Sequence, residues 1–325
     1  MKVVIPGGTG EVGSILAKTF LLRGHEVIIL TRQHQTSSSG KLQFANWDAE
    51  NLGHWTDTLE GADAIINLAG RTVNCRYTEE NRKQIKESRV KSTQILGEAI
   101  AQLSKPPKTW LQMSTATIYA HTYERSNDEY FGIIGGDEPN VPDSWRYSIE
   151  VARAWEEALD QAPVSKFTRR IKMRTSIVMS PHQGGPFDIL LRLVRMGLGG
   201  TSGNGNQYIS WISDVDFANA VFFLLEQKEI SGAVNLASPN PLPNRDFMRI
   251  LREAWGTKFG LPASEWMLEM GAVPLKTETE LVLKSRKVHP AKLLQAKFPF
   301  EHPYWEEAAV DLCYRWKQEQ KVKAG

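Results

Sequence analysis

The sequence is poor in cysteine and has no long apolar run. Cys75 and Cys313 are the only cysteines in 325 residues, too few for a disulfide framework and at no spacing typical of a metal site. The seven histidines also form no pair at metal-binding spacing. No apolar run approaches the roughly 20 residues that span a bilayer. Residues 1–6 do not resemble a signal peptide, because their apolar stretch runs straight into glycines. We therefore expect a cytoplasmic protein with no metal and no membrane contact.

The charge shows no excess of one sign. There are 39 basic and 37 acidic side chains, a formal net charge of +2, which gives no bulk field to hold nucleic acid. The hydrophobic fraction of 41% and the charged fraction of 23% are typical of a globular protein. No Gly-x-Ser-x-Gly elbow is present, which excludes a serine hydrolase of that type. A small molecule is the expected partner.

Short apolar runs alternate with amphipathic stretches through the first 180 residues. The strand candidates are short, rich in Val and Ile, and bounded by Gly, Pro, Asn or Ser: Lys2–Ile5, Glu26–Leu30, Ala62–Leu68, Thr109–Met113 and Ile171–Val178. The helix candidates between them have a helical period of apolar residues: Val12–Arg23, Glu79–Leu103 and Tyr147–Gln161. This alternation predicts an α/β fold, a Rossmann doubly wound parallel sheet with helices on both faces.

The regular alternation of strand and helix candidates ends at about residue 180. Helix-like segments then alternate with loops rich in Gly, Pro and Asn, and one strand candidate, Ala233–Ala237, interrupts them. We expect residues 1–180 to form the dinucleotide-binding domain, with the chain returning to it around 207–237. Residues 181–325 are expected to form a smaller, mostly helical C-terminal lobe that contacts the substrate, of which 264–320 is a short C-terminal domain.

A glycine-rich turn follows the first strand candidate. Gly7, Gly10 and Gly13 have the spacing of a pyrophosphate-binding turn between a strand and a helix. Glycine there permits a left-handed turn, a close approach of backbone to phosphate, and tight packing of helix on strand. The predicted cofactor-binding residues of this turn are Gly7, Thr9, Gly10, Glu11, Val12 and Gly13. Glu11 should point to solvent, away from the phosphates. The alternative is a glycine turn without a ligand.

The end of the second strand candidate indicates which dinucleotide is bound. An acid there would hold the adenosine ribose hydroxyls and favour NAD. This sequence has Thr31 and Arg32 instead, a hydroxyl and a guanidinium that suit a 2′-phosphate. We therefore predict that NADP(H) is preferred and that NAD(H) is possible. The alternative for Arg32 is an ordinary solvated arginine.

Several motifs together resemble the short-chain dehydrogenase/reductase superfamily, in its extended branch of nucleotide-sugar epimerases and dehydratases. They are the glycine turn, Asn67–Gly70, Met113–Tyr119 and the stretch from Gly203 to Asp216. A narrower resemblance is to an atypical group of epimerase-family proteins, NAD(P)-dependent epimerase/dehydratase-like, with a C-terminal domain of unknown function. It is carried by Asn74–Tyr77, Gly197–Gly200, Asn235–Pro239 and Glu280–Val288, and the resemblance covers the chain from Met1 to about Asp311.

The resemblance implies further cofactor-binding residues. It places Leu68, Ala69 and Gly70 along the adenine-ribose side and Asp48 near the adenine amino group. It also places Arg89, on the long helix candidate, facing the cofactor; the alternative is a surface arginine. Human relatives of the narrower group resemble NADP(H) binders, in agreement with Arg32.

The superfamily's hydride chemistry uses a Ser or Thr, a Tyr, and a Lys four residues after the Tyr. The Lys lies one helical turn from the phenol and lowers its pKa, so that the Tyr can act as acid or base. Thr115 and Tyr147 match the first two positions, but the fourth residue after Tyr147 is Val151. Two functions therefore stay open: an oxidoreductase or epimerase-like enzyme acting on a small carbonyl or sugar-like substrate, and a catalytically impaired regulator or sensor that binds NADP(H).

Three residues are candidates for contact with the substrate. Arg71 and Arg76 follow the strand candidate Ala62–Leu68, where ligands of an open parallel sheet lie, and their guanidinium groups would suit a carboxylate or phosphate. Trp211 is expected to wall the cleft. The alternative for the arginines is a solvated loop. By analogy with the superfamily, a homodimer through the long helices is possible.

Overall fold

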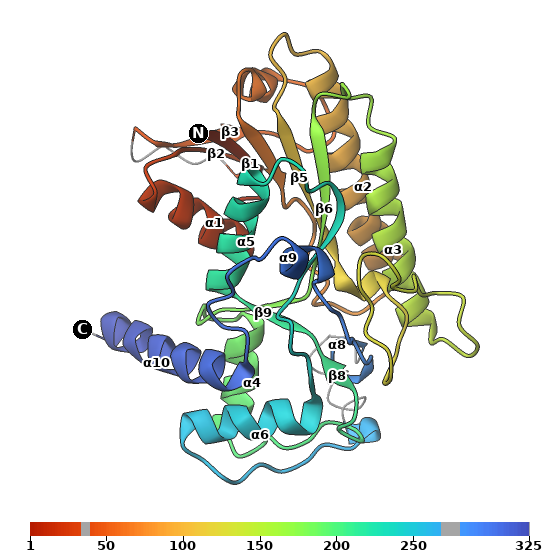
Figure 1. The fold of residues 1–325 in the computed structure, drawn as a ribbon, viewed down its shortest axis with the longest axis vertical. Helices are drawn as coiled ribbons and strands as arrows, with labels where there is room; N and C mark the ends of the chain where they lie inside the picture. Colours follow the sequence, from red (N-terminus) through yellow and green to blue (C-terminus); the bar gives the residue numbers. More distant parts are fainter. Residues whose placement is uncertain (34–39, 268–279, 325) are drawn as a thin grey trace.

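A seven-stranded parallel sheet forms the centre of the computed structural model, which describes residues 1–33, 40–267 and 280–324 (Figure 1). Its strand order is β10-β6-β5-β4-β1-β2-β3, and every neighbouring pair is parallel. The strands are β1 (Lys2–Pro6), β2 (Glu26–Thr31), β3 (Leu42–Asn46), β4 (Ala64–Asn67), β5 (Thr109–Thr115), β6 (Arg169–Thr175) and β10 (Gly232–Leu236).

Helices cover both faces of this sheet (Figure 1). On one face α1 (Glu11–Leu22) and α5 (Asp214–Glu226) pack through apolar residues such as Phe20 and Phe217. On the other face α2 (Glu79–Ala101) and α3 (Asp143–Asp160) pack through residues such as Leu96 and Leu159. The strands are almost continuously apolar because both of their faces are buried. The predicted Rossmann architecture is therefore confirmed.

A smaller lobe lies beyond the sheet, at the bottom of Figure 1. Its helices are α4 (Pro186–Arg195), α6 (Asn244–Trp255) and α10 (Trp305–Ala324), which share an apolar core around Trp211 and Trp305. Two short two-stranded sheets join it to the rest: β7 (Ile177–Met179) with β9 (Trp211–Ser213), and β8 (Tyr208–Ile209) with β11 (Leu242–Pro243). The predicted mostly helical C-terminal lobe is thus present. Within the described ranges, no helix combines the length and apolarity needed to cross a membrane.

The segment after α6 returns to the main sheet. It contains α8 (Glu280–Leu283) and α9 (Ala291–Gln295), joined by a stretch in which Val288 forms an isolated bridge with Asn127. Ser210 fixes this stretch, because its hydroxyl donates to the Arg286 carbonyl at 2.7 Å and accepts from the Val288 amide at 2.9 Å. The C-terminal chain is therefore pinned beside the end of β5 rather than packed only on the lobe.

Three elements differ from the sequence prediction. Helix α3 begins at Asp143, so Tyr147 lies in its second turn. The strand expected over Ile171–Val178 divides at Ser176, and β7 leaves the main sheet to pair with β9. Strand β3 lies outside the predicted strand ranges; it is an edge strand, its residues are half-buried or exposed, and it shows only a weak apolar signal.

A buried ion pair joins α3 to the sheet. Arg174 on β6 donates to both carboxylate oxygens of Glu156, through Nε and Nη2, each at 2.8 Å. Ser114 on β5 donates to the same carboxylate at 2.7 Å, and Arg174 also donates to the Tyr119 hydroxyl at 3.0 Å. The side chains of Glu156 and Arg174 are only 7% and 12% exposed, so each compensates the charge of the other in the protein interior.

Replacing Glu156 by Ala should strongly destabilise the fold. The change leaves the Arg174 guanidinium buried without its carboxylate, and we expect the free energy of unfolding in urea to fall by about 3–5 kcal/mol. The matched control is Glu157→Ala in the same helix, where the side chain is exposed and accepts from Gln161; its effect should stay within about 0.5 kcal/mol. Similar losses for both variants would contradict this account of the ion pair.

Candidate functional site

The glycine turn is packed too tightly for any other residue at two positions. Gly7 has φ +75°, and a Cβ added there would lie 2.9 Å from the backbone of Ala69. A Cβ added to Gly13 would lie 2.5 Å from the Cα of Gly8, so the first turn of α1 rests directly on the turn before it. This close packing leaves the backbone of the turn open to a ligand on its other side, as a bound pyrophosphate requires.

The first turn of α1 faces the same side. Gly10 is the N-cap and supplies no side-chain cap, so the amide hydrogens at the start of the helix have no partner within it and form an anion site. Val12 lies in this turn. Glu11 does not point to solvent as expected: its carboxylate is half-buried and accepts from the Ser180 hydroxyl at 2.5 Å. That contact ties the carboxylate to the chain after β7.

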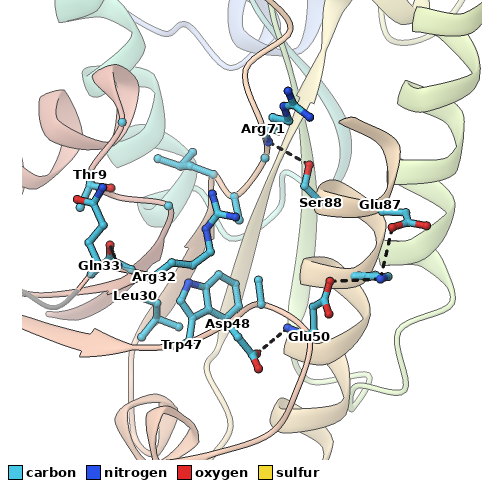
Figure 2. A pocket seen from close by; sticks show the side chains of 18 of the residues that line it. Thr9, Leu30, Arg32, Gln33, Trp47, Asp48, Glu50, Arg71, Glu87 and Ser88 are labelled. Carbon is cyan, nitrogen blue, oxygen red and sulfur yellow. Dashed lines mark hydrogen bonds and ion pairs between the residues drawn. The ribbon is translucent and has the colours of Figure 1, made fainter. Parts of the chain in front are cut away.

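A cavity of about 620 Å³ opens over the turn and the ends of β1, β2 and β4 (Figure 2). Arg32 extends into it above Trp47. Within the described residues no carboxylate pairs with the Arg32 guanidinium, which leaves it available for an anionic ligand. The sequence-predicted residues that line this cavity come from four chain segments: Gly7, Thr9, Gly10, Thr31, Arg32, Asp48, Leu68, Ala69, Gly70 and Arg71.

The acidic residues along this cavity are already occupied. Asp48 accepts from the side chain of Asn51 and from two backbone amides, and these hydrogen bonds, the Asn51 side chain first, lower the pKa of its carboxyl. Lys91 bridges the carboxylates of Glu50 and Glu87, at 3.2 and 3.4 Å. The acids are therefore held in local contacts, whereas Arg32 is not.

Arg89 lies beneath the loop that follows β4. Its Nη1 donates to the carbonyls of Arg71 and Ile85, at 3.0 and 2.9 Å, and its guanidinium lies over the Trp155 ring. Burial lowers the pKa of Arg89 to about 10. This contact fixes the loop on α2. Arg71 lines the first cavity and donates to Asn81, while Arg76 lines neither this cavity nor the one described next.

A second cavity, of about 200 Å³, lies at the carboxyl ends of β5 and β6. It contains both residues predicted to be catalytic, together with Arg89. Three further polar side chains in its lining come from α3 and from the C-terminal segment. Its polar and charged lining residues are Tyr77, Arg89, Thr115, Thr117, Tyr147, Ser148, Thr175, Ser176, Glu280 and Arg286.

The Tyr147 hydroxyl is engaged in a hydrogen bond to the backbone and is poorly suited to act as an acid or a base. Its hydroxyl donates to the Arg82 carbonyl at 2.6 Å, and its ring packs edge-on against Tyr77. Burial raises the pKa of Tyr147 to about 12. Val151, one turn further along α3, is buried beside it and supplies no charge. Thr115 in turn accepts from the Thr117 amide at 3.1 Å, which orders the start of the 3₁₀ turn η2 (Ala116–Ile118).

The C-terminal segment brings Glu280 and Arg286 to the lining of this cavity and Lys284 next to it, and none of the three was predicted from the sequence. The Lys284 amine is fully buried and donates to the Thr117 carbonyl at 2.9 Å; burial first, then Arg286, lower its pKa to about 8. Glu280 lies between Lys284 and Arg286, and its side chain is 2% exposed. The only signal for these residues was their place in the stretch Glu280–Val288 that carried the family resemblance.

Trp211 does not border either cavity. It is fully buried in the lobe core, where its ring packs edge-on against Trp305. The expectation that it walls the cleft is therefore replaced by a role in packing. Among the described residues, no three His, Cys, Asp or Glu side chains are grouped so that they could hold a metal ion.

Several known proteins are similar to this chain over most or all of its length. The human epimerase family protein SDR39U1 is 28% identical over 306 residues, covering 93% of this chain and 96% of its own. A crystal structure of human SDR39U1 (isoform 2) with NADPH has a TM-score of 0.83 at 27% identity and covers 97% of this chain and 99% of its own. A nucleoside-diphosphate sugar epimerase from Corynebacterium glutamicum has a TM-score of 0.73 at 29% identity, covering all of this chain and 62% of its own.

Two family models match successive parts of the chain. Residues 263–312 match a domain of unknown function, DUF1731. Residues 3–237, which include the glycine turn, the first cavity and the end of β5, match the NAD-dependent epimerase/dehydratase family. The chain therefore belongs to the NAD-dependent epimerase/dehydratase family.

Proposed function

We propose that this protein is an NADP(H)-dependent oxidoreductase or epimerase-like enzyme that acts on a small carbonyl or sugar-like compound. The observation that carries the proposal is the Arg32 guanidinium, which follows β2, extends into the first cavity and has no carboxylate partner among the described residues. Beside it, Thr31 supplies a hydroxyl that accepts from the Gln33 amide at 3.2 Å. A 2′-phosphate on the adenosine ribose is the anion that this pair suits.

The glycine turn suits the pyrophosphate in the middle of the same cofactor. The amides at the start of α1 would hold the pyrophosphate, and a Cβ at Gly7 or Gly13 would displace the backbone that forms the cradle. The structure of human SDR39U1 with NADPH supports the same assignment. When bound, a nicotinamide supplies or accepts a hydride; the chain's own task is to bind it, orient the substrate and handle the proton.

The second cavity is the proposed substrate site. It lies at the carboxyl ends of β5 and β6, where the ligands of open parallel sheets bind. Thr115 and Thr117 present hydroxyls there, Ile85 and Ile177 supply apolar walls, and Arg89 contributes a positive charge. A compact compound with one polar reacting centre fits a cavity of about 200 Å³ with such a lining.

One observation favours a second function, an NADP(H)-binding regulator without hydride transfer. The Tyr147 hydroxyl donates to the Arg82 carbonyl, burial raises its pKa to about 12, and Val151 stands where the superfamily has a lysine. A phenol in this state is a weak acid near neutral pH. The regulator and the enzyme share the first cavity and differ in the chemistry of the second.

Arg32→Ala should weaken NADPH binding selectively. Loss of charge-assisted hydrogen bonds to a 2′-phosphate is expected to raise the Kd for NADPH about tenfold or more, while the Kd for NADH changes by less than about twofold, because NADH lacks that phosphate. Both constants are measured by titrating the nicotinamide fluorescence.

The matched control is Arg249→Ala, which removes the same charge from α6 in the lobe, where Arg249 pairs with Glu253. It should leave both constants unchanged. Equal weakening of NADPH and NADH by Arg32→Ala would show that this guanidinium does not read the phosphate.

A panel of small aldehydes, ketones, 1,2-dicarbonyls and nucleotide sugars should separate the enzyme from the regulator. The enzyme is expected to oxidise NADPH in the presence of at least one panel member, or to epimerise one of the sugars, followed by absorbance at 340 nm and by product NMR. Thr115→Val should reduce kcat, because it removes the hydroxyl at the end of β5. Tight NADPH binding with no turnover of any panel member would favour the regulator.

A further inference from the structure

Three side chains from distant parts of the chain meet in the second cavity. Tyr77 comes from the loop before α2, Ser148 from α3, and Glu280 from α8 in the C-terminal segment. The Tyr77 hydroxyl lies 3.3 Å from Ser148 Oγ, and Ser148 Oγ donates to Glu280 Oε2 at 2.5 Å. The three groups therefore form a continuous chain of hydrogen bonds along the cavity wall.

The direction of this chain follows from the number of hydrogens. Ser148 has a single hydroxyl hydrogen, and it is used in the bond to Glu280. The contact between Tyr77 and Ser148 can then form only if the phenol donates to a lone pair of Ser148. Each hydroxyl thus donates toward the carboxylate, and Glu280 is the final acceptor. This is the arrangement of a base at the end of a proton path.

Two cations lie close to the Glu280 carboxylate. Glu280 Oε1 lies 3.4 Å from Arg286 Nη2 and 3.9 Å from Lys284 Nζ. The other titratable groups lining the cavity are Arg89 on α2 and the phenols of Tyr77 and Tyr147. No second carboxylate lines the cavity in the described part of the chain, so Glu280 is its only carboxyl group able to take up a proton.

Tyr147 cannot take the place of this chain. Its hydrogen is already given to the Arg82 carbonyl, and the two aromatic rings, Tyr77 and Tyr147, meet edge to face with centroids 5.1 Å apart. The phenol that is linked to an acid–base group is therefore Tyr77. Thr115 and Thr117 lie in the same lining, so a substrate oxygen held at the end of β5 would be in the cavity that Tyr77 and Glu280 face.

We propose that Glu280, acting through Ser148 and Tyr77, is the acid–base group of this site, in place of the Tyr–Lys pair of the superfamily. This inference rests on the proposed enzymatic function. Tyr77 is the residue that contacts the substrate oxygen; Ser148 and Glu280 act through it. The C-terminal segment then has a chemical task, because Glu280 lies outside residues 3–237 that match the epimerase/dehydratase family.

Every proton in the proposed oxidation step has a donor and an acceptor. When an alcohol is oxidised, its hydroxyl proton passes to Tyr77, the Tyr77 proton to Ser148, and the Ser148 proton to Glu280, while the carbon-bound hydride leaves for the nicotinamide. Both hydroxyl groups end as they began, and the carboxyl carries the extra proton, which it then releases to water. Reduction of a carbonyl runs the same transfers in reverse.

Protein labelled with ¹³C at the glutamate side-chain carboxyls tests the inference without relying on turnover. The Glu280 resonance is identified by its loss in Glu280→Gln and is followed as a function of pH with NADP⁺ bound. We expect it to titrate within the pH range in which the protein stays folded, and Ser148→Ala to move the midpoint. A resonance that does not titrate, or that Ser148→Ala leaves in place, overturns the inference.

The pH profile of turnover provides a second test on any compound that the panel shows to react. Glu280→Gln should lower kcat about a hundredfold or more and abolish the limb of the profile whose midpoint matches the NMR titration. Glu280→Asp should restore part of the rate and the limb. Tyr77→Phe should lower kcat to a similar extent. Glu253→Gln, on α6 in the lobe, should keep the native profile.

The outcomes of the two proposals can be told apart. Failure of the wild-type protein to bind NADPH would count against the proposed function, whatever the Glu280 resonance shows. NADPH affinity that stays native in Glu280→Gln, together with a lost pH limb, supports the inference. A native pH profile in Glu280→Gln, or a loss of rate in Tyr147→Phe that exceeds the loss in Glu280→Gln, overturns it.

Discussion

The parallel direction of all seven strands is the constraint on which the site depends. Because the strands run the same way, their carboxyl ends meet at one edge of the sheet, and Thr31, Leu68 and Thr115 are brought together although they are far apart in sequence. The helices that follow β1 and β4 begin at or near that edge, so the helix amides and the loop after β4 face the same ligand. Without the close contact of Gly13 on Gly8, α1 could not approach the turn from which it presents those amides.

The carboxyl edge of the sheet forms only part of the second cavity. The C-terminal segment supplies further lining residues, Glu280 and Arg286. Lys284 donates to the Thr117 carbonyl, and the Ser285 hydroxyl accepts from the Tyr208 amide and donates to the Thr122 carbonyl. These contacts fasten the segment to the loop after β5 and hold Glu280 beside Ser148. Burying the Lys284 amine costs free energy, as its lowered pKa of about 8 shows. The neighbouring carboxylate of Glu280 partly offsets that cost.

Patterns that depend on local geometry were readable from the sequence, and contacts between distant segments were not. The Gly7–Gly13 turn and Arg32 follow from spacing along one strand, one turn and one helix, so their neighbourhood could be inferred before the structure was known. By contrast, Ser148 and Glu280 are 132 residues apart, and no periodicity relates them. Trp211 is a second example. Its position near a motif suggested that it borders a cleft, but the Trp211 side chain is buried against Trp305, which comes from the distant helix α10. Strand β3 was missed because an edge strand needs fewer apolar residues.

The apolar residue at position 151 agrees with the proposed acid–base role of Glu280 on electrostatic grounds. A lysine there would point at Tyr147 from the next helical turn, into a wall that already contains the buried Arg89. Two adjacent buried cations without an acid would destabilise each other. An apolar Val151 lets Tyr147 pack against Ile85 and hold the Arg82 carbonyl. In the proposed mechanism the proton is handled by the carboxylate of Glu280, which accepts from Ser148 on the same helix as Tyr147 and whose charge Arg286 and Lys284 balance. The proposed site therefore has a phenol linked to a carboxylate, whereas the superfamily pattern has a phenol beside a lysine.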